Sequence, residues 1–401
     1  MTERGRLAVH LTQADRVALH QFAGRLGRGA FSVLDTPDGT QLEVGPLVGL
    51  FALPSFTLRV QPKAELHPWN VLYMLHRSSR RTLPLPPVGQ ELEETDLLEA
   101  LAALFLSQLR PQLLRGLLRR SEQVQDDLPT LRGRLRVPEY LRRADPTRLP
   151  VEYADLQAGH PVNRLFLLVL ERLAFWVEAK RSRQQVAELR VLLRDAGVQA
   201  LGSVPFPAQR HGFTLNRLQR RYEPALNLAW LLLDGMSPVS QAGSWRGQAF
   251  AFDMDRLFEK FLERVLIEDI LPETRYSGHA QGRGLSQQYL FTKEAQELRP
   301  DLIIKEGEAV NLIIDFKNKP PEQSFGRDDV YQMYAYARHL HCAKVLLLYS
   351  SQTTPVTIEA TQGAPLSLTA AGVDLRQDLR VTLPEFHEQL RTLLRGQGLQ
   401  L

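Results

Sequence analysis

The sequence predicts a mixed α/β protein, α+β overall, in three parts: a small β-rich domain over residues 1–90, a mainly helical region over 91–245 and a C-terminal α/β domain over 246–401. Short apolar runs broken by turn signals predict the first part. Apolar residues at helical spacing predict the second, and elements in the order α-β-β-β-α-β predict the third. With 401 residues, 44% of them hydrophobic, the chain can bury a substantial core.

Residues 30–62 predict the β-rich first part, because Pro-Asp-Gly and Leu-Pro-Ser turn signals separate short apolar runs there. Residues 69–78, WNVLYMLHRS, are typical of a helix, and the proline-rich, acidic residues 82–95 are typical of a connector. We expect this part to make contacts rather than to carry chemistry.

The middle part is predicted to be mostly helical. Helices are expected over residues 96–110, 112–120, 161–182, 185–196 and 213–234. Pro111 should kink or stop the first of them, and Pro224 should bend the last. Between them, Arg132, Arg134 and Arg136 would share one face of an extended segment, where they could hold phosphates or an acidic partner. The alternative is a set of intramolecular ion pairs.

Composition excludes several classes of protein. The single cysteine, Cys342, excludes an internal disulfide framework and a multi-cysteine zinc site, so a cytoplasmic location is expected. Arg164, Glu171 and Arg172 interrupt the most apolar helical run, which argues against a membrane span. The formal net charge of +4 suits a polyanionic partner without requiring one.

The last part has a clear order of elements. A helix over 253–270 places apolar residues on one stripe, and it is followed by a strand over 285–291 and a hairpin over 301–317. A helix over 328–340 and a strongly apolar strand over 343–350 complete the order.

The hairpin carries charges that a buried strand normally avoids. Residues two apart in a strand point to the same side, so Asp315 and Lys317 would project together, and the tight connection would bring Asp301 beside Asp315. Two carboxylates and an ammonium suit a Mg²⁺ ion with phosphate oxygens, an arrangement for phosphodiester hydrolysis. The alternative is an ordinary strand end with an exposed ion pair.

The ordered set Pro300-Asp301 and Asp315-Phe316-Lys317 resembles the PD-(D/E)xK nuclease motif, whose core is restriction-endonuclease-like. The rest of the sequence resembles the McrC family over nearly the whole chain. The segments that carry this resemblance include LRVQPKAEL, LRGRLRVPEYLRR, MDRLFEKFLERVL and VYQMYAYA. McrC is the nuclease subunit of the McrBC modification-dependent (type IV) restriction system. The resemblance implies that Asp301 and Asp315 bind Mg²⁺, that the backbone carbonyl of Phe316 is a further ligand, and that Lys317 acts on the attacking water.

The resemblance also assigns roles to helical residues. Glu259 would complete the metal shell, although Asp255 and Glu263 share its row and the three could pair with neighbouring basic residues instead. Gln332 and Tyr336 match a Q-x-x-x-Y element that positions the DNA strand, and a polar edge of an amphipathic helix explains them almost as well.

The sequence departs from the family pattern beside the motif, and it lacks two other kinds of functional motif. Phe316 and Asn318 stand where many relatives have threonine and an aromatic residue, which we interpret as local repacking. His339, His341 and Cys342 lack metal-ligand spacing. The sequence has no G-x-x-x-x-G-K-[ST] motif, so any nucleotide hydrolysis must come from another subunit.

The resemblance therefore implies a Mg²⁺-dependent endonuclease that cuts double-stranded, methylcytosine-containing DNA together with a McrB-like AAA+ GTPase ring. GTP would act only through that partner, whose hydrolysis this chain would stimulate, and the β-rich region 1–90 would dock on the ring. Two alternatives remain: a standalone repair-type nuclease that cuts without partner or nucleotide, and a non-catalytic adaptor on a nuclease fold. A neighbouring AAA+ reading frame would argue against the first, and an essential acidic pair against the second.

Overall fold

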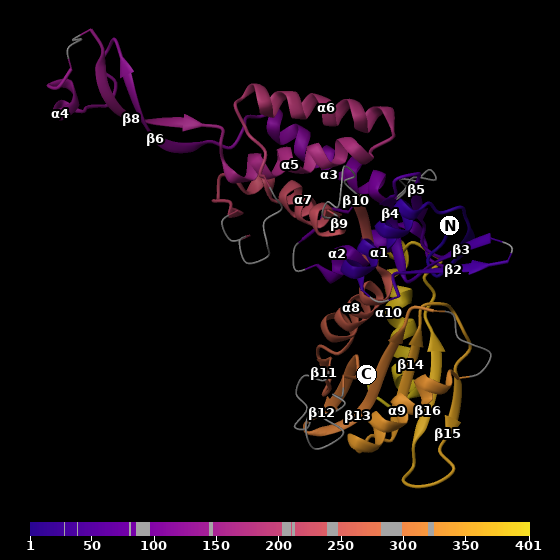
Figure 1. Cartoon of the computed structure of the whole chain (residues 1–401). Coiled ribbons are helices and arrows are strands. Elements are labelled where there is room, and N and C mark those ends of the chain that lie inside the picture. The colour runs from indigo at the N-terminus through magenta and orange to yellow at the C-terminus, as the bar shows by residue number, and fades with distance from the viewer. Residues whose placement is uncertain are drawn as a thin grey trace. The chain divides into compact units, whose positions relative to one another are not determined.

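The structure, a computed structural model, describes the chain except for residues 28, 38, 80–81, 86–96, 144–146, 203–209, 211–212, 239–247, 282–298 and 320–324. It contains two compact units, one made of Met1–Leu97 with Ser237–Leu401 and the other of Leu98–Met236 (Figure 1). The predicted limits near residues 90 and 245 lie outside the described residues. Both ends of the chain contribute to the first unit, and the mixed α/β class is confirmed.

The N-terminal region contains two small sheets. Strands β1 (Arg6–Ala8), β2 (Phe31–Thr36) and β3 (Gly39–Val44) form a sheet in the order β1-β3-β2; β4 (Leu47–Ala52), β5 (Thr57–Val60), β10 (Gln248–Asp253) and β9 (Met236–Pro238) form a sheet in the order β5-β4-β10-β9. The predicted strands are present, and the helix expected over residues 69–78 is α2 (Pro68–Ser78). The partner-docking role of this region stays a prediction.

Helix α1 (Gln13–Leu26) was not predicted, although its sequence carries a start signal. Thr12 caps the helix: its hydroxyl accepts the Asp15 backbone N–H at 3.2 Å, and the Asp15 carboxylate accepts the Thr12 backbone N–H at 2.9 Å. Asp15 is fully buried and also accepts the backbone N–H of Ser55 at 3.0 Å. The helix packs on β4 through Phe22 and Phe51, whose ring centroids lie 5.7 Å apart.

A six-stranded sheet forms most of the C-terminal region. Its strands, in spatial order, are β11 (Ser277–Ala280), β12 (Leu302–Glu306), β13 (Ala309–Lys317), β14 (Lys344–Tyr349), β16 (Ser367–Gly372) and β15 (Val356–Glu359). The predicted hairpin is present as the antiparallel pair β12 and β13, whereas β14 runs parallel to both β13 and β16. The strand predicted over 285–291 lies outside the described residues, and β11 was not anticipated.

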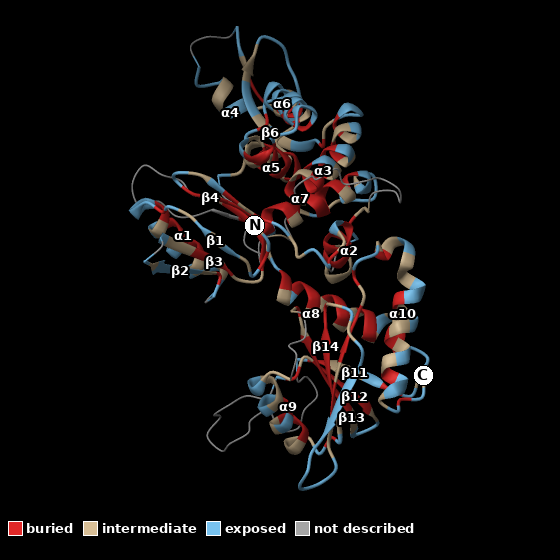
Figure 2. Ribbon diagram, turned by 90° about the vertical axis from the view of Figure 1, so that its right-hand side faces the viewer, coloured by how far each residue is buried: buried red, intermediate tan, exposed pale blue. Residues whose placement is uncertain are grey.

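Parallel neighbours need a crossover, and α9 (Arg327–His339) supplies it between β13 and β14. These strands are continuous apolar runs because both of their faces are covered. Figure 2 shows β13 and β14 buried, with exposed residues along α9. Ile313, Val345 and Leu347 pack against Met333 of α9 in one cluster.

The helix predicted over 253–270 is present as α8 (Met254–Arg264), continued by a π-helical turn over Val265–Ile270. The apolar stripe is buried as expected, since Leu257, Phe258 and Phe261 are all at most 6% exposed. Helix α10 (Leu379–Gly396) contacts both this turn and α2. These contacts join the N-terminal and C-terminal regions of the first unit.

The second unit combines helices with a long β-ribbon. Its helices are α3 (Leu97–Leu114), α5 (Pro161–Trp176), α6 (Lys180–Asp195) and α7 (Glu223–Gly235), the last preceded by a 3-10 turn (Arg220–Tyr222). β6 (Arg120–Leu128), β8 (Leu149–Gln157) and β7 (Arg134–Leu135) form a sheet in the order β6-β8-β7, with the short helix α4 (Val137–Tyr140) at the far end of the ribbon (Figure 1). None of the helices within the described ranges is long and apolar enough to cross a membrane.

Two predictions about this unit were wrong. α3 runs through Pro111 to Leu114, and Gly116, whose φ is 123°, ends the helical path before β6 begins. The helix expected over 112–120 therefore does not form. The helix expected over 213–234 begins only at Glu223, with Pro224 in its first turn, where proline is tolerated.

The arginines near β7 are largely engaged within the chain. Arg132 pairs with Asp155 at 3.0 Å, and its guanidinium carbon lies 3.9 Å from the centre of the Tyr153 ring. Arg136 pairs with Glu139. For these two arginines, the alternative of intramolecular ion pairs is confirmed.

The Asp15 network predicts acid-sensitive stability. Burial alone would raise the pKa of Asp15, but hydrogen bonds from Thr12 and Ser55 outweigh it and lower the pKa. A lowered carboxyl pKa stabilises the fold at neutral pH, and this contribution is lost as pH falls below about 4. We expect Asp15→Asn to lower the free energy of unfolding at pH 7 by about 1–3 kcal/mol, with a smaller deficit at pH 3.

Chemical denaturation at pH 7 and pH 3 measures this difference. Glu385→Gln, which changes an exposed carboxylate of α10, is the control and should match wild type at both values. A deficit of Asp15→Asn that stays the same at both pH values would contradict the proposed linkage.

Candidate active site

The register of the hairpin brings the two predicted aspartates together. Leu302 pairs with Ile314, so Asp301, one residue before β12, lies opposite Asp315 near the end of β13. The Asp301 carboxylate accepts the backbone N–H of Phe316 at 2.7 Å. The position of Asp301 is therefore fixed by backbone pairing on one side and by its own side chain on the other.

Lys317 joins this pair from the same face of the strand. Because side chains alternate along a strand, Ile313, Asp315 and Lys317 all face α9. The Lys317 ammonium lies 2.7 Å from the Asp315 carboxylate and 3.0 Å from that of Asp329 on α9. Asp329 also pairs with Lys319 at 3.1 Å. The side chains of Asp315 and Lys317 are only 5% and 19% exposed, so the alternative of an exposed ion pair at a strand end is wrong.

Asp329 belongs to the candidate site but was not predicted from the sequence. It lies in the first turn of α9, where an acidic side chain also interacts favourably with the positive end of the helix dipole. The available signal was the order of charges, with one lysine at the end of β13, another just after it, and two aspartates at the start of the next helix. Nothing in that order shows that the helix turns back over the strand.

The two aspartates strongly disfavour being ionised together. Burial is the largest cause and raises the pKa of Asp301 to about 8, with a further contribution from the negative charge of Asp315. Burial also raises the pKa of Asp315, against the opposing effect of Lys317. The charge of Glu259 acts on both in the same direction. Negative charge crowded in this way is stabilised by a nearby cation.

The environment of Lys317 favours its charged form. Burial alone would lower its pKa, but the charges and hydrogen bonds of Asp315 and Asp329 outweigh that effect and raise the pKa above its ordinary value. At Asp329, burial is likewise outweighed by hydrogen bonds from Lys317 and Lys319, which lower its pKa. The pair Lys317 and Asp329 is therefore ionised at neutral pH, and Lys317 is a hydrogen-bond donor rather than a base.

Glu259 of α8 stands at the edge of this group. It is partly exposed and accepts a hydrogen bond from the Gln281 side chain at 3.2 Å. Its row-mate Asp255 pairs instead with Arg4 at 2.5 Å. Of these two acidic residues, Glu259 is the one whose charge raises the pKa of both Asp301 and Asp315.

Gln332 and Tyr336 lie together on α9, and the Gln332 amide donates to the Tyr336 hydroxyl at 3.0 Å. Tyr336 is only 7% exposed and belongs to the core beneath the helix, whereas Gln332 is exposed. Their role in positioning DNA stays a prediction.

The side chains fit a hard divalent cation held by few protein ligands. Within the described parts of the chain, no three His, Cys, Asp or Glu side chains come together as a metal-binding group. Mg²⁺ is commonly bound through one or two carboxylates, with waters and substrate phosphates completing its shell. Asp315 supplies a buried carboxylate of that kind, and Asp301 supplies a partly buried one. Phe316 is 7% exposed, and the metal-binding role of its carbonyl stays a prediction.

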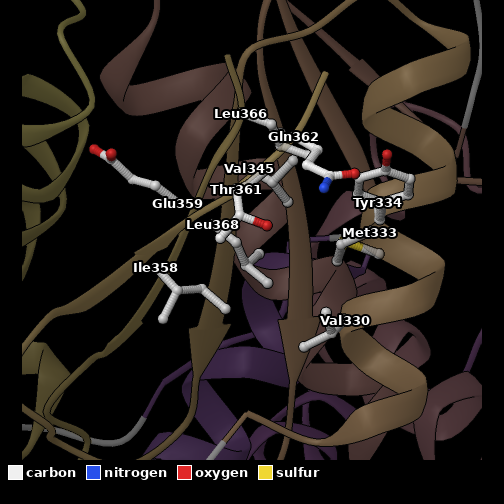
Figure 3. A pocket seen from close by; sticks show the side chains of 11 residues that line it. Val330, Met333, Tyr334, Val345, Ile358, Glu359, Thr361, Gln362, Leu366 and Leu368 are labelled. Atoms are coloured by element: carbon white, nitrogen blue, oxygen red, sulfur yellow. The ribbon is translucent and has the colours of Figure 1, made fainter. Parts of the chain in front are cut away.

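A separate cavity lies between α9 and the outer strands of the sheet. It has a volume of about 310 Å³ and is lined mainly by apolar side chains, among them Val330, Met333, Ile358 and Leu368 (Figure 3). None of the predicted site residues lines it. Cys342 is buried nearby in the core, where its thiol donates to the Lys344 carbonyl at 3.1 Å.

The sequence and the structure are similar to those of known proteins. The family model described as McrBC 5-methylcytosine restriction system component matches residues 42–350, a range that contains all the predicted site residues. A chain in the refined half-complex from the tetradecameric assembly of Thermococcus gammatolerans McrB AAA+ hexamers with bound McrC has a TM-score of 0.74 and 18% identity, with 98% of this chain and 99% of that chain covered. That likeness shows a shared fold over almost the whole length.

A chain in the cryo-EM structure of the Thermococcus gammatolerans McrBC complex has a TM-score of 0.49 and 20% identity, covering 67% of this chain and 86% of that chain. No curated protein matches this sequence.

The raised pKa of Asp301 predicts that the metal-free protein loses stability as pH rises. The folded chain holds a proton that the unfolded chain releases, so the free energy of unfolding falls between about pH 4 and the folded pKa of about 8. Asp301→Asn keeps an acceptor for Phe316 but removes the titration. In EDTA at pH 8 we expect this variant to melt at least about 1 °C above wild type, the shift that roughly 1 kcal/mol produces in a chain of this size.

Thermal unfolding at pH 5 and pH 8 provides the test. Glu308→Gln, at the exposed turn of the same hairpin, is the matched control and should follow wild type. If Asp301→Asn and wild type lost the same stability between the two pH values, Asp301 would not carry a raised pKa.

Proposed function

Because this chain belongs to the family of McrBC 5-methylcytosine restriction system components, we propose that it is the Mg²⁺-dependent endonuclease subunit of such a system. It cuts methylcytosine-containing double-stranded DNA together with an AAA+ GTPase partner, whose hydrolysis it stimulates. The observation that carries the proposal is the pair of opposed carboxylates, Asp315 buried and Asp301 partly buried, beside an ion-paired lysine at the end of β13. On this proposal, the six-stranded sheet with α8 and α9 is a PD-(D/E)xK core.

Asp301 and Asp315 would hold the cation, with Glu259 and the Phe316 carbonyl as additional ligands. When bound, Mg²⁺ supplies Lewis-acid stabilisation of the charge that develops on the scissile phosphate. The protein contributes a rigid pair of carboxylates, since the hairpin register and the Phe316 N–H hold Asp301 in place. Burial, and to a lesser extent nearby negative charge, raises the pKa of both aspartates, and a bound cation would stabilise their ionised forms.

Lys317 would orient the attacking water and stabilise negative charge in the transition state. Its raised pKa keeps it protonated, so it donates hydrogen bonds and does not abstract the proton. Asp329 holds the ammonium from the α9 side at 3.0 Å, opposite the contact to Asp315. Gln332 and Tyr336, further along α9, would position the DNA strand.

The partner would supply both nucleotide hydrolysis and recognition of the modified base. The sequence itself has no P-loop motif. The chain shares its fold with one from an assembly of McrB AAA+ hexamers with bound McrC. We propose a McrB-like AAA+ ring as the partner of this protein, with residues 1–90 as the docking element predicted from the sequence.

Charge distribution supports a polyanionic substrate. Residues 98–236 contain 21 Arg and Lys against 14 Asp and Glu, a formal net charge of +7, whereas the rest of the chain has 28 against 31, or −3. The basic excess is thus concentrated in the second unit, where it would attract the DNA backbone.

Cleavage of methylated and unmethylated plasmid tests the proposal. The protein is incubated with Mg²⁺, alone and with the AAA+ partner and GTP, and wild type is compared with Asp315→Ala. We expect cutting only in the full mixture and only on methylated DNA. Asp315→Ala should reduce the rate at least about 100-fold, the scale on which loss of one group that stabilises transition-state charge slows an enzyme.

Asp328→Asn is the matched control, because Asp328 is an exposed aspartate beside Asp329 in the first turn of α9. It should cut at nearly the wild-type rate. Cutting by the protein alone would identify a standalone nuclease instead. Full activity of Asp315→Ala would place the chemistry elsewhere and leave this fold as an adaptor.

A further inference from the structure

A polar network joins the N-terminal region to the end of the strand that carries Lys317. Lys63 follows β5 in the segment Gln61-Pro62-Lys63, and its ammonium donates to the Asn318 side-chain oxygen at 2.8 Å and to the Ser350 hydroxyl. Asn318 directly follows Lys317 at the end of β13, and Ser350 directly follows β14. Asn318 is 5% exposed and Ser350 is fully buried. One lysine therefore bridges the carboxyl ends of two adjacent parallel strands.

The bridge lies next to the backbone of Lys317. The Ser350 N–H donates to the Lys317 carbonyl oxygen at 3.1 Å, which extends the parallel ladder by one bond beyond the pairing of Lys317 with Tyr349. Lys63 thus holds Ser350 by its hydroxyl, while Ser350 holds Lys317 by its carbonyl. The chain of contacts from Lys63 to the backbone of Lys317 contains a single intervening residue.

The Asn318 side chain is held from its other end as well. Its amide donates to Asp255 of α8 at 3.2 Å and lies 3.4 Å from the Glu3 carboxylate. Asp255 is also bound by the Arg4 guanidinium at 2.5 Å and 2.7 Å. The residue that follows Lys317 is therefore fixed by groups from the N-terminus, from Lys63 and from α8.

These contacts keep charged groups out of water at a cost. Burial lowers the pKa of Lys63 and raises the pKa of Glu3. Replacing a buried charged network by apolar residues is often neutral or stabilising, so stability alone is a weak reason for such an arrangement. What the network does provide is a single geometry at the end of β13, because each hydrogen bond is directional.

We propose that Lys63 is a positioning residue for the nuclease site, a role that rests on the proposed function. By clamping Asn318 and Ser350, it fixes the backbone at the end of β13 so that the Lys317 ammonium remains between Asp315 and Asp329. The site would then depend on a residue more than 230 positions before the hairpin in the sequence. Misplacement of a catalytic group by as little as about 1 Å can slow a reaction about 100-fold.

Lys63→Met tests this role in the full-length protein, because it removes the ammonium and keeps an unbranched apolar side chain. Lys344→Met is the matched control: Lys344 is at the opposite end of β14 and donates to the Gln397 carbonyl at 2.6 Å. The first readout is amide hydrogen exchange, which requires no nuclease activity. We expect faster exchange in Lys63→Met at Ser350 and Asn318, with Val345–Leu348 unchanged, and no change at these two amides in Lys344→Met.

The second readout is steady-state cleavage in the complete mixture with partner, GTP and Mg²⁺. We expect Lys63→Met to reduce kcat at least about 10-fold with little change in KM for DNA, and Lys344→Met to leave both unchanged. Ser350→Ala removes one of the two acceptors and leaves Lys63 bound to Asn318. It should lower kcat by a smaller factor, and it provides the same test if Lys63→Met does not fold.

The outcomes separate the two proposals. Unchanged exchange at Ser350 and Asn318 in Lys63→Met, or a wild-type kcat in that variant beside an active wild type, would overturn the positioning role alone. An equal fall in kcat for Lys344→Met would also overturn it, because loss of any buried lysine contact would then suffice. Wild-type protein that cuts no DNA in any mixture would overturn the proposed function and the positioning role with it.

Discussion

The antiparallel register between β12 and β13 is the constraint on which the candidate site depends. It places Asp301 opposite Asp315 on one face of the sheet, and a shift by one residue would turn one carboxylate into the opposite layer. The register is set by the apolar residues of both strands, which are buried on both faces. Core packing therefore determines the distance between two charged groups that contribute little to the core themselves.

The same sheet explains why Lys317 remains charged beside those groups. The side chains of Asp315 and Lys317 lie on the face of β13 that α9 covers. The crossover between the parallel strands β13 and β14 places the first turn of that helix over them. Asp329 then balances the lysine from the helix side. Without it, the lysine would have one carboxylate to share with a cation. With it, the ammonium would keep a partner if Asp315 bound a metal ion, as proposed.

Local patterns allowed the prediction of the elements that carry the candidate site, whereas its long-range contacts could not be predicted. The hairpin, α8 and α9 follow from alternation and helical periodicity, so their existence and order could be read from the sequence. The roles of Asp329 and Lys63 could not, because they depend on which segments fold back onto β13. The β6–β8 ribbon was missed for another reason: its polar, charged residues lack the apolar alternation of a half-buried strand.

Residues from both ends of the chain form the first unit, and contacts between them hold the end of β13. A C-terminal domain made only of residues after 246 would leave Asn318 and Ser350 without the lysine that bridges them, and Asp255 without Arg4. Buried polar atoms that lose their partners cost roughly 1–3 kcal/mol each, more when charged. The N-terminal region and the sheet are therefore coupled through hydrogen bonds as well as through the contacts of α2 with α8 and α10. A displacement of the N-terminal region would therefore reach the end of β13, and the backbone of Lys317 beside it, through few intervening groups.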